Sequence, residues 1–167
     1  MNSAEAAPAR QNIHLLHGDD SFSVQRELLR LTESLIDPAD AAMNLMRLDG
    51  KTASLEEIQT AVSTLSFFGT DRLVILDGLP VKLEKTRQEK FLKILERMPE
   101  STTLLLVMDD RPHWRMVNGQ WAQSWEILNE AHWLQKWAKG KSNVVVKPFA
   151  LPQMREMDSW ILKEAKE

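Results

Sequence analysis

The chain has 167 residues, of which 43% are hydrophobic and none is cysteine, so it can build one substantial core but no disulfide or thiolate metal site. Lys and Arg number 21 against 24 Asp and Glu, giving a net charge of -3 and a sequence pI of about 5.8, which argues against binding nucleic acid through bulk positive charge. Residues 1–12 are small and polar without the apolar stretch of a signal peptide, so we expect a disordered tail on a soluble, cytoplasmic protein.

The first 50 residues carry two strand patterns with a helix pattern between them. A short apolar run at residues 13–17 ends in Gly18-Asp19-Asp20 and predicts a buried strand. Ser21 is a suitable N-cap for the following helix, and Pro38 ends it. Residues 43–48 then predict a second strand. The predicted apolar stripe of the helix consists of Val24, Leu28, Leu31 and Leu35, widened by Phe22, Leu29 and Ile36.

Residues 54–78 join a helix pattern to a strand pattern through a bulky apolar corner. Ser54 and Glu57 have the spacing of a capping box. The helical apolar positions are Leu55, Ile58, Val62 and Leu65. On a continued helix, Phe67 would lie about 200° around the axis from Leu65 and therefore off the buried stripe.

Two Phe residues at this corner suggest a contact with a partner. A Phe side chain gains about 1.5–3 kcal/mol on burial, so a ring left outside the core needs something to cover it. Phe67 and Phe68 are therefore candidate contact residues. The alternative is that both rings cap the edge of the sheet inside the same molecule.

Three further apolar runs, at residues 72–76, 103–108 and 143–147, complete a set of five predicted strands. Helix patterns occupy residues 83–98 and the stretch from Pro152 onwards. This alternation predicts an α/β fold: a five-stranded, mostly parallel sheet with helices on both faces. In such folds the functional edge is the carboxyl end of the strands.

Residues 111–141, between the last two predicted strands, hold five of the six Trp residues. The set Trp114, Val117, Trp121, Trp125 and Leu128 follows a helical stripe. It predicts an inserted helical pair that buries its own indoles. The alternative is a set of Trp platforms for single-stranded bases, but Asp and Glu are interspersed in this segment and Arg is rare.

The loop after the first strand, GDDSFSVQRE, lacks the Lys and the Gly-rich backbone that surround phosphates in nucleotide-binding loops. The carboxylates of Asp19 and Asp20 would repel a phosphate. In an ATPase the residue after Asp77 would be an acid that orients the attacking water, but here it is Gly78. We therefore expect neither an independent nucleotide-binding enzyme nor any catalytic residue, cofactor or metal site. His14 and His17 are assigned structural roles.

Acidic strand ends allow a second interpretation, a phosphoacceptor receiver-like signalling domain. Receivers have an acidic pair, a phosphoacceptor aspartate and a Lys-Pro pair at three strand ends, and these are resembled here by Asp19-Asp20, Asp77 and Lys147-Pro148. The fourth strand departs from the receiver pattern, because it ends in Met108-Asp109 where a hydroxyl residue is usual. The same carboxylates could be solvated strand-end caps. Strand order tests this interpretation, since a receiver places strand one between strands two and three.

Four segments, in their order and spacing, resemble the N-terminal part of the delta subunit of bacterial DNA polymerase III clamp loaders: IHLLHGDDSF, LSFFGTDRLVILDG, STTLLLVMDD and VVVKPFALPQMREMDSWILKEAKE. The resemblance implies an AAA+ base domain, P-loop-NTPase-like but without a functional phosphate loop, over residues 13–149, with the helical insertion at 111–141. AAA+ topology places strand one between strands four and five. It also implies that residues 150–167 are the first helix of a truncated lid domain.

In that family, hydrophobic residues before strand three enter a pocket of the sliding clamp, so the resemblance implies clamp-binding roles for Phe67, Phe68 and Leu65. Leu65 ranks last because it continues the buried stripe. The implied function is to bind and open the clamp for loading on primed DNA, as a non-catalytic subunit of the DNA polymerase III holoenzyme, itself a DNA-directed DNA polymerase and nucleotidyltransferase. The implied partners are the sliding clamp (beta subunit) and the gamma/tau and delta prime subunits, with DNA contacted only in the assembled complex and no membrane.

Overall fold

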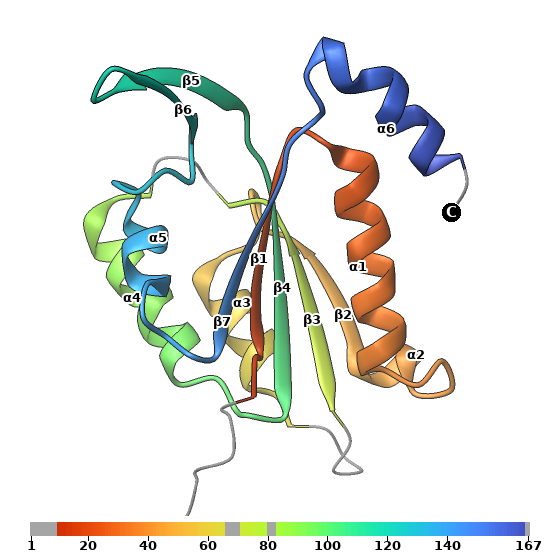
Figure 1. Cartoon of the computed structure of the whole chain (residues 1–167). Helices are drawn as coiled ribbons and strands as arrows, with labels where there is room; N and C mark the ends of the chain where they lie inside the picture. Colours follow the sequence, from red (N-terminus) through yellow and green to blue (C-terminus); the bar gives the residue numbers. More distant parts are fainter. Residues whose placement is uncertain (1–9, 66–70, 80–82, 166–167) are drawn as a thin grey trace, which may run out of the picture.

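The structure, a computed structural model, describes residues 10–65, 71–79 and 83–165. Its centre is a five-stranded sheet in the order β2-β3-β4-β1-β7, in which every neighbouring pair is parallel (Figure 1). The strands are β1 (Ile13–Gly18), β2 (Leu45–Asp49), β3 (Arg72–Asp77), β4 (Thr102–Asp109) and β7 (Val144–Phe149). The first strand thus lies between the fourth and fifth of the predicted strands, which is the AAA+ order and not the receiver order.

Helices cover both faces of the sheet, as predicted (Figure 1). One face is covered by α1 (Ser21–Leu35), with the short α2 (Ala41–Asn44) beside it. The other carries α3 (Leu55–Ser63), α4 (Lys85–Glu96) and α5 (Trp133–Ala138). After β7 the chain continues through a 3-10 turn, Met154–Glu156, into α6 (Met157–Glu164).

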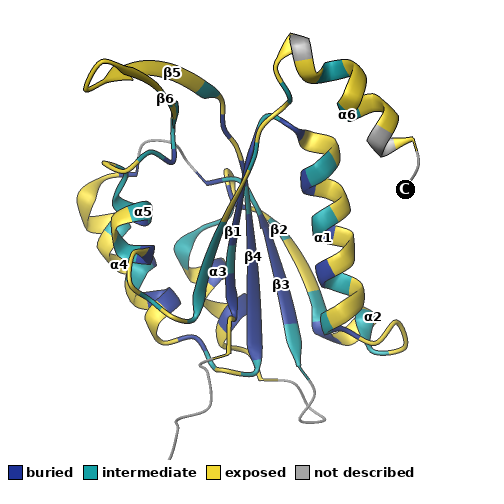
Figure 2. Ribbon diagram, viewed as in Figure 1, coloured by how far each residue is buried: buried dark blue, intermediate teal, exposed yellow. Residues whose placement is uncertain are grey.

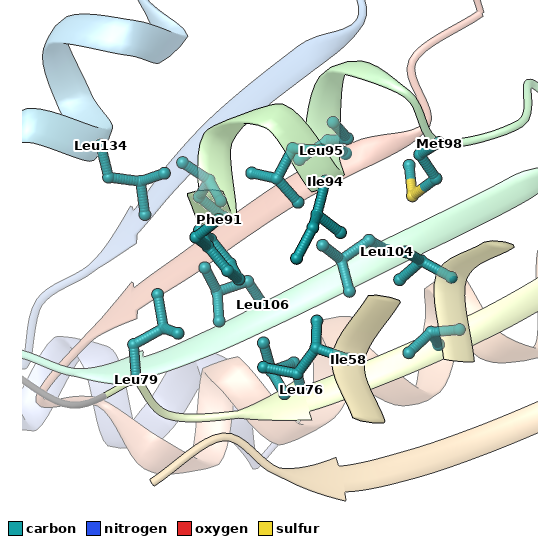
Figure 3. Packing of buried hydrophobic residues seen from close by; sticks show 14 of the residues in the cluster. Ile58, Leu76, Leu79, Phe91, Ile94, Leu95, Met98, Leu104, Leu106 and Leu134 are labelled. Carbon is teal, nitrogen blue, oxygen red and sulfur yellow. The ribbon is translucent and has the colours of Figure 1, made fainter. Parts of the chain in front are cut away.

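Alternate strand residues point into two separate hydrophobic clusters, one on each face of the sheet. In the larger cluster, Phe91, Ile94 and Leu95 of α4 lie on the β4 residues Leu104 and Leu106 (Figure 3). Residues 102–106 of β4 are buried throughout, so this part of the strand is covered on both faces (Figure 2). A strand buried on both faces explains the continuous apolar run in the sequence.

Several predicted boundaries and burials differ from the structure. The N-cap of α1 is Asp20 rather than Ser21. Phe22 and Leu29 are 58% and 59% exposed, because α1 packs on the sheet through the narrower stripe of Val24, Leu28 and Leu31. The last strand runs through Pro148, which is tolerated because β7 is an edge strand.

The prediction of a helical insertion at residues 111–141 is wrong for its first half. That half is an antiparallel hairpin of β5 (Pro112–Val117) and β6 (Gln120–Trp125), separate from the main sheet. The turn residues Asn118 and Gly119 have φ values of 50° and 79°, the left-handed conformation of a two-residue hairpin turn. An Asn-Gly pair disfavours a continuing helix and favours such a turn. The backbone preference of these two residues therefore favours a hairpin over a helix in this segment.

Candidate functional site

The corner between α3 and β3 is held in place at both ends of the helix. At its start, Ser54 Oγ accepts a hydrogen bond from the Glu57 amide at 3.1 Å and the Ser54 amide donates to Glu57 Oε2 at 2.7 Å, the predicted capping box. At its end, Arg72 Nε donates to the carbonyl oxygen of Ala61 at 2.9 Å. The Arg72 side chain therefore ties the last turn of the helix to the first residue of β3.

The helix ends at Ser63, and Thr64 adopts an extended conformation with φ -69° and ψ 120°. Leu65 therefore does not continue the buried stripe, and its side chain is 65% exposed. The expectation that Leu65 continues the buried stripe was wrong, because it assumed a helix reaching residue 65.

Phe67 and Phe68 lie outside the described residues, so their roles remain predictions. The argument from helical rotation that singled out Phe67 no longer applies, because the helix ends before it. What supports the two Phe residues is their place in the chain, two and three residues after the exposed Leu65.

The exposed Leu65 lies near the amino end of β3, at the edge of the sheet opposite the loop that follows β1. This candidate residue therefore does not lie at the carboxyl ends of the strands, where the fold class led us to expect a functional site. Beside the corner is a shallow pocket of about 360 Å³ between α3 and the edge strand β2. Its lining includes Met46, Leu48, Ala61, Thr64 and Arg72.

At the carboxyl edge, the loop after β1 fills its own anion-binding position. Asp20 Oδ1 accepts from the Ser23 amide at 3.0 Å, so a carboxylate occupies the amino end of α1 where a phosphate would bind. Asp19 Oδ1 accepts from the Leu151 amide at 2.9 Å. A Cβ atom on Gly18 would lie 1.8 Å from the Phe149 carbonyl oxygen, which shows how tightly this loop packs against the end of β7.

The carboxylate of Asp77, the residue that a receiver would phosphorylate, forms an ion pair with Arg47. Across the described ranges no group of three His, Asp or Glu side chains is arranged to hold a metal ion. Nor does any helix in these ranges have the length and apolar character needed to cross a membrane.

A buried polar pair that the sequence did not reveal lies where β4 leads into the hairpin. His17 Nδ1 donates to Asp110 Oδ2 at 3.1 Å, and both side chains are almost fully buried. The ring of Trp125 meets the His17 ring edge-on at 4.7 Å between centroids. Burial lowers the pKa of His17, although the nearby Asp110 opposes this shift, so the ring is neutral near pH 7.

Asp110 also organises the chain on both sides of the hairpin. Its Oδ1 accepts from the amides of Arg111 at 2.9 Å and Ile127 at 2.8 Å, and its Oδ2 accepts from the amide of Leu128 at 2.8 Å. A single carboxylate thus joins the residue before the hairpin to the segment after it.

The second half of the 111–141 segment is structural. Leu134 of α5 is fully buried, and the Trp133 ring meets Phe91 of α4 edge-on at 6.0 Å. Trp137 Nε1 donates to Glu96 Oε1 at 2.9 Å. Trp133 and Trp137 on α5 and Trp125 at the base of the hairpin are therefore packed, whereas Trp114 and Trp121 are exposed. The shared spacing did not predict this division.

Comparison with known proteins gives a family and a fold. A family model described as DNA polymerase III, delta subunit, matches residues 14–122. The solved structure of the Bacillus subtilis DNA clamp loader delta protein (YqeN) superposes with a TM-score of 0.67 at 16% identity, covering 94% of this chain and 43% of that one. A DNA polymerase III gamma subunit-related protein from Thermotoga maritima gives a TM-score of 0.47 at 19% identity, covering 88% of this chain and 44% of that one. No curated protein matches the sequence.

The sheet order and the structural match define the class: an α/β protein with the AAA+-like fold of clamp-loader subunits. Since the family model covers more than half of the chain, the protein belongs to the DNA polymerase III delta subunit family. It spans less than half the length of the Bacillus relative.

Proposed function

We propose that this chain is the clamp-binding part of a clamp-loader delta subunit, and that Leu65, Phe67 and Phe68 are the residues that bind the sliding clamp. The observation that carries the proposal is the 65% exposure of Leu65, two residues after the end of a helix that buries Ile58, Ala61 and Val62. Membership of the delta family makes a clamp the natural partner.

The physical basis is a small set of anchors on a rigid support. Ile58, Ala61 and Val62 fix α3 on the sheet, and the capping box and Arg72 hold its two ends. Apolar side chains that follow such a helix enter a concave pocket with little loss of conformational entropy. A few anchors of this kind supply most of the binding energy of an interface.

Opening the clamp needs more than binding. The chain must bind the open clamp more tightly than the closed one, because a ligand shifts a conformational equilibrium only by its difference in affinity for the two states. We infer that this chain acts in the cytoplasm with the beta, gamma/tau and delta prime subunits, that it meets primed DNA within that assembly, and that it performs no catalysis itself.

The test is binding of this chain to a bacterial sliding clamp, measured by isothermal titration calorimetry with Leu65→Ala, Phe67→Ala and Phe68→Ala. Leu29→Ala is the matched control, because it removes an equally exposed leucine from α1. We expect each corner variant to lose about fivefold or more in affinity, equivalent to about 1 kcal/mol, and the control to lose nothing. Losses below twofold for all three variants, in proteins that melt like the wild type, would rule out the assigned site.

The proposal also predicts that ATP has no effect on the chain. Saturating ATP with Mg²⁺ should leave the melting temperature unchanged, because the Asp20 carboxylate occupies the amino end of α1. A clear upward shift would instead favour an independent nucleotide-binding enzyme.

A further inference from the structure

A groove of about 300 Å³ lies between α3 and α4. Below it, Ile58 of α3 and Ile94 of α4 belong to the same hydrophobic cluster (Figure 3). Both helices end at the amino edge of the sheet, because each one leads into a parallel strand, β3 or β4. We call this feature the α3–α4 groove, and its lining includes Gln59, Ser63, Lys90, Lys93, Ile94 and Arg97.

The α4 wall of this groove is cationic. Lys90, Lys93 and Arg97 follow one another at spacings of three and four residues, so they share one side of the helix, and all three are exposed. Among the residues that the structure describes, no carboxylate lies within ion-pair distance of these three side chains. Glu56 is the one acid in the described lining, and it belongs to the first turn of α3, at the opposite end from Ser63.

The acidic residues of α4 leave this wall positive. Glu96 Oε1 accepts from Trp137 Nε1 at 2.9 Å and from Lys141 Nζ at 3.3 Å, so its carboxylate faces α5. Glu89 stands one turn before Lys93 and is exposed, and the described structure contains no ion pair between them. The cations of the groove are therefore free to meet charge from outside the chain.

The surface between the groove and the proposed clamp-binding corner carries no negative charge of its own. Residues 58–70 contain no Asp, Glu, Lys or Arg. The next residue, Asp71, pairs with Arg10 at 2.8 Å. That hydrogen bond to Asp71 and, to a lesser degree, the charge of Glu100 raise the pKa of Arg10, so both acids act on this arginine. In a chain with a net charge of -3, an apolar corner thus lies beside an unneutralised cationic groove.

We propose that the α3–α4 groove binds an acidic segment of the sliding clamp, next to the pocket that receives the corner; this inference rests on the proposed clamp-binding function. Ser63 lines the groove only two residues before Leu65, so a partner seated on Leu65 also covers the groove. Lys93 and Arg97, on the last part of α4, pair with carboxylates of that partner, and the Arg97 guanidinium can hold one through two hydrogen bonds.

The groove and the corner have different physical roles in this proposal. Complementary charge across an interface raises the association rate and fixes the orientation of the partner more than it adds affinity. Buried apolar anchors supply most of the affinity. The groove therefore orients the clamp, and the corner holds it.

Nucleic acid is the other polyanion that a cationic groove can attract, and the lining favours a protein. No aromatic side chain is among the described lining residues, so the groove offers no platform on which a base can stack. The Glu56 carboxylate would repel a phosphate backbone that continued along the groove, whereas an acidic protein segment needs only a few carboxylates near Lys93 and Arg97.

The test measures binding of the full chain to a bacterial sliding clamp by surface plasmon resonance at about 50 mM and about 500 mM NaCl. The double variant Lys93→Gln/Arg97→Gln should bind about fivefold more weakly at the lower salt, mainly through slower association. At the higher salt, where the Debye length is about 4 Å, it should bind within about twofold of the wild type. Both side chains are exposed and Gln is a good helix former, so the variant should melt like the wild type.

Two comparisons identify the source of any loss. Arg115→Gln/Lys139→Gln is the matched control, because it removes one exposed Arg and one exposed Lys that lie outside the groove, and it should match the wild type at both salts. Leu65→Ala should lose affinity at both salts, because salt does not screen the burial of an apolar side chain.

The possible failures are distinguishable. Unchanged association of the folded double variant at low salt would overturn the role of the groove and leave the proposed function standing. Loss of oligothymidine binding in the double variant, measured by fluorescence anisotropy, with clamp binding intact would also overturn it and make the groove a nucleic-acid site. A wild-type chain that does not bind the clamp at either salt would overturn the proposed function and this inference together. A salt-dependent loss in the double variant with full binding by Leu65→Ala would support the groove and count against the corner.

Discussion

Replacing Asp110 by Ala tests whether one buried carboxylate holds the hairpin to the domain. The carboxylate accepts four hydrogen bonds, from the amides of Arg111, Ile127 and Leu128 and from His17 Nδ1. Two of these donors, the Leu128 amide and the His17 ring, are buried and cannot turn to water in the variant. The variant therefore leaves at least two buried donors without partners.

The expected loss follows from these two donors. Each buried donor that loses its partner costs about 1–3 kcal/mol, so the pair costs about 2–6 kcal/mol, and we expect about 4 kcal/mol. The loss is large compared with the 5–15 kcal/mol of total stability that is typical of a domain. It corresponds to a fall in melting temperature of about 8–16 °C for a chain of this size.

Urea unfolding followed by Trp fluorescence measures this loss, and the Trp125 indole on His17 reports on the site itself. Asp109→Ala is a matched control, because it removes the neighbouring carboxylate, whose side chain is 95% exposed. The control should change stability by less than about 0.5 kcal/mol. If Asp110→Ala costs less than about 1 kcal/mol, the carboxylate does not join the two sides of the hairpin in the way described.

Two further predictions concern acid and helix capping. Burial lowers the pKa values of His14, His17 and His132, so the folded state binds fewer protons than the unfolded state below about pH 6.5. Stability should therefore be full above pH 6.5 and fall as the pH drops towards the folded pKa values, by at most about 1.4 kcal/mol per pH unit for each His. His17→Gln should make this fall shallower, and urea midpoints between pH 8 and 5.5 that keep the wild-type slope would contradict the assignment. Ser54→Ala removes the side-chain cap of α3 and should cost about 1 kcal/mol in the same assay. Ser63→Ala at the other end of α3 is its control, and equal losses in the two variants would argue against the cap.

Much of the fold was predictable because its signals are local. An apolar run such as residues 103–108 indicates either a buried strand or a buried helix. The short length of these runs and the turn residues on both sides indicate strands. The capping box at Ser54 and Glu57 is a contact between residues three apart, so it is written in the sequence directly. The acidic character of the loop after β1 is likewise a matter of residue types at Asp19 and Asp20.

The helical insertion was the main error, and its cause can be identified. Trp114, Trp121 and Trp125 fall on one face both at helical spacing and in a hairpin that turns at Asn118-Gly119. Their spacing therefore could not distinguish the two structures. The Asn-Gly pair could have done so, because it needs positive φ at both residues and is the strongest local signal for a tight hairpin.

By itself, the sequence determined the alternation of strands and helices, the capped start of α3 and the acidic loop after β1, since each depends on residues close together in the chain. Tertiary structure alone decided that β1 lies between β4 and β7, that His17 meets Asp110 across 93 residues, and that Leu65 and the hairpin indoles remain in water. The physical reason is that periodicity reports which face of an element is apolar, whereas burial depends on which other element reaches that face.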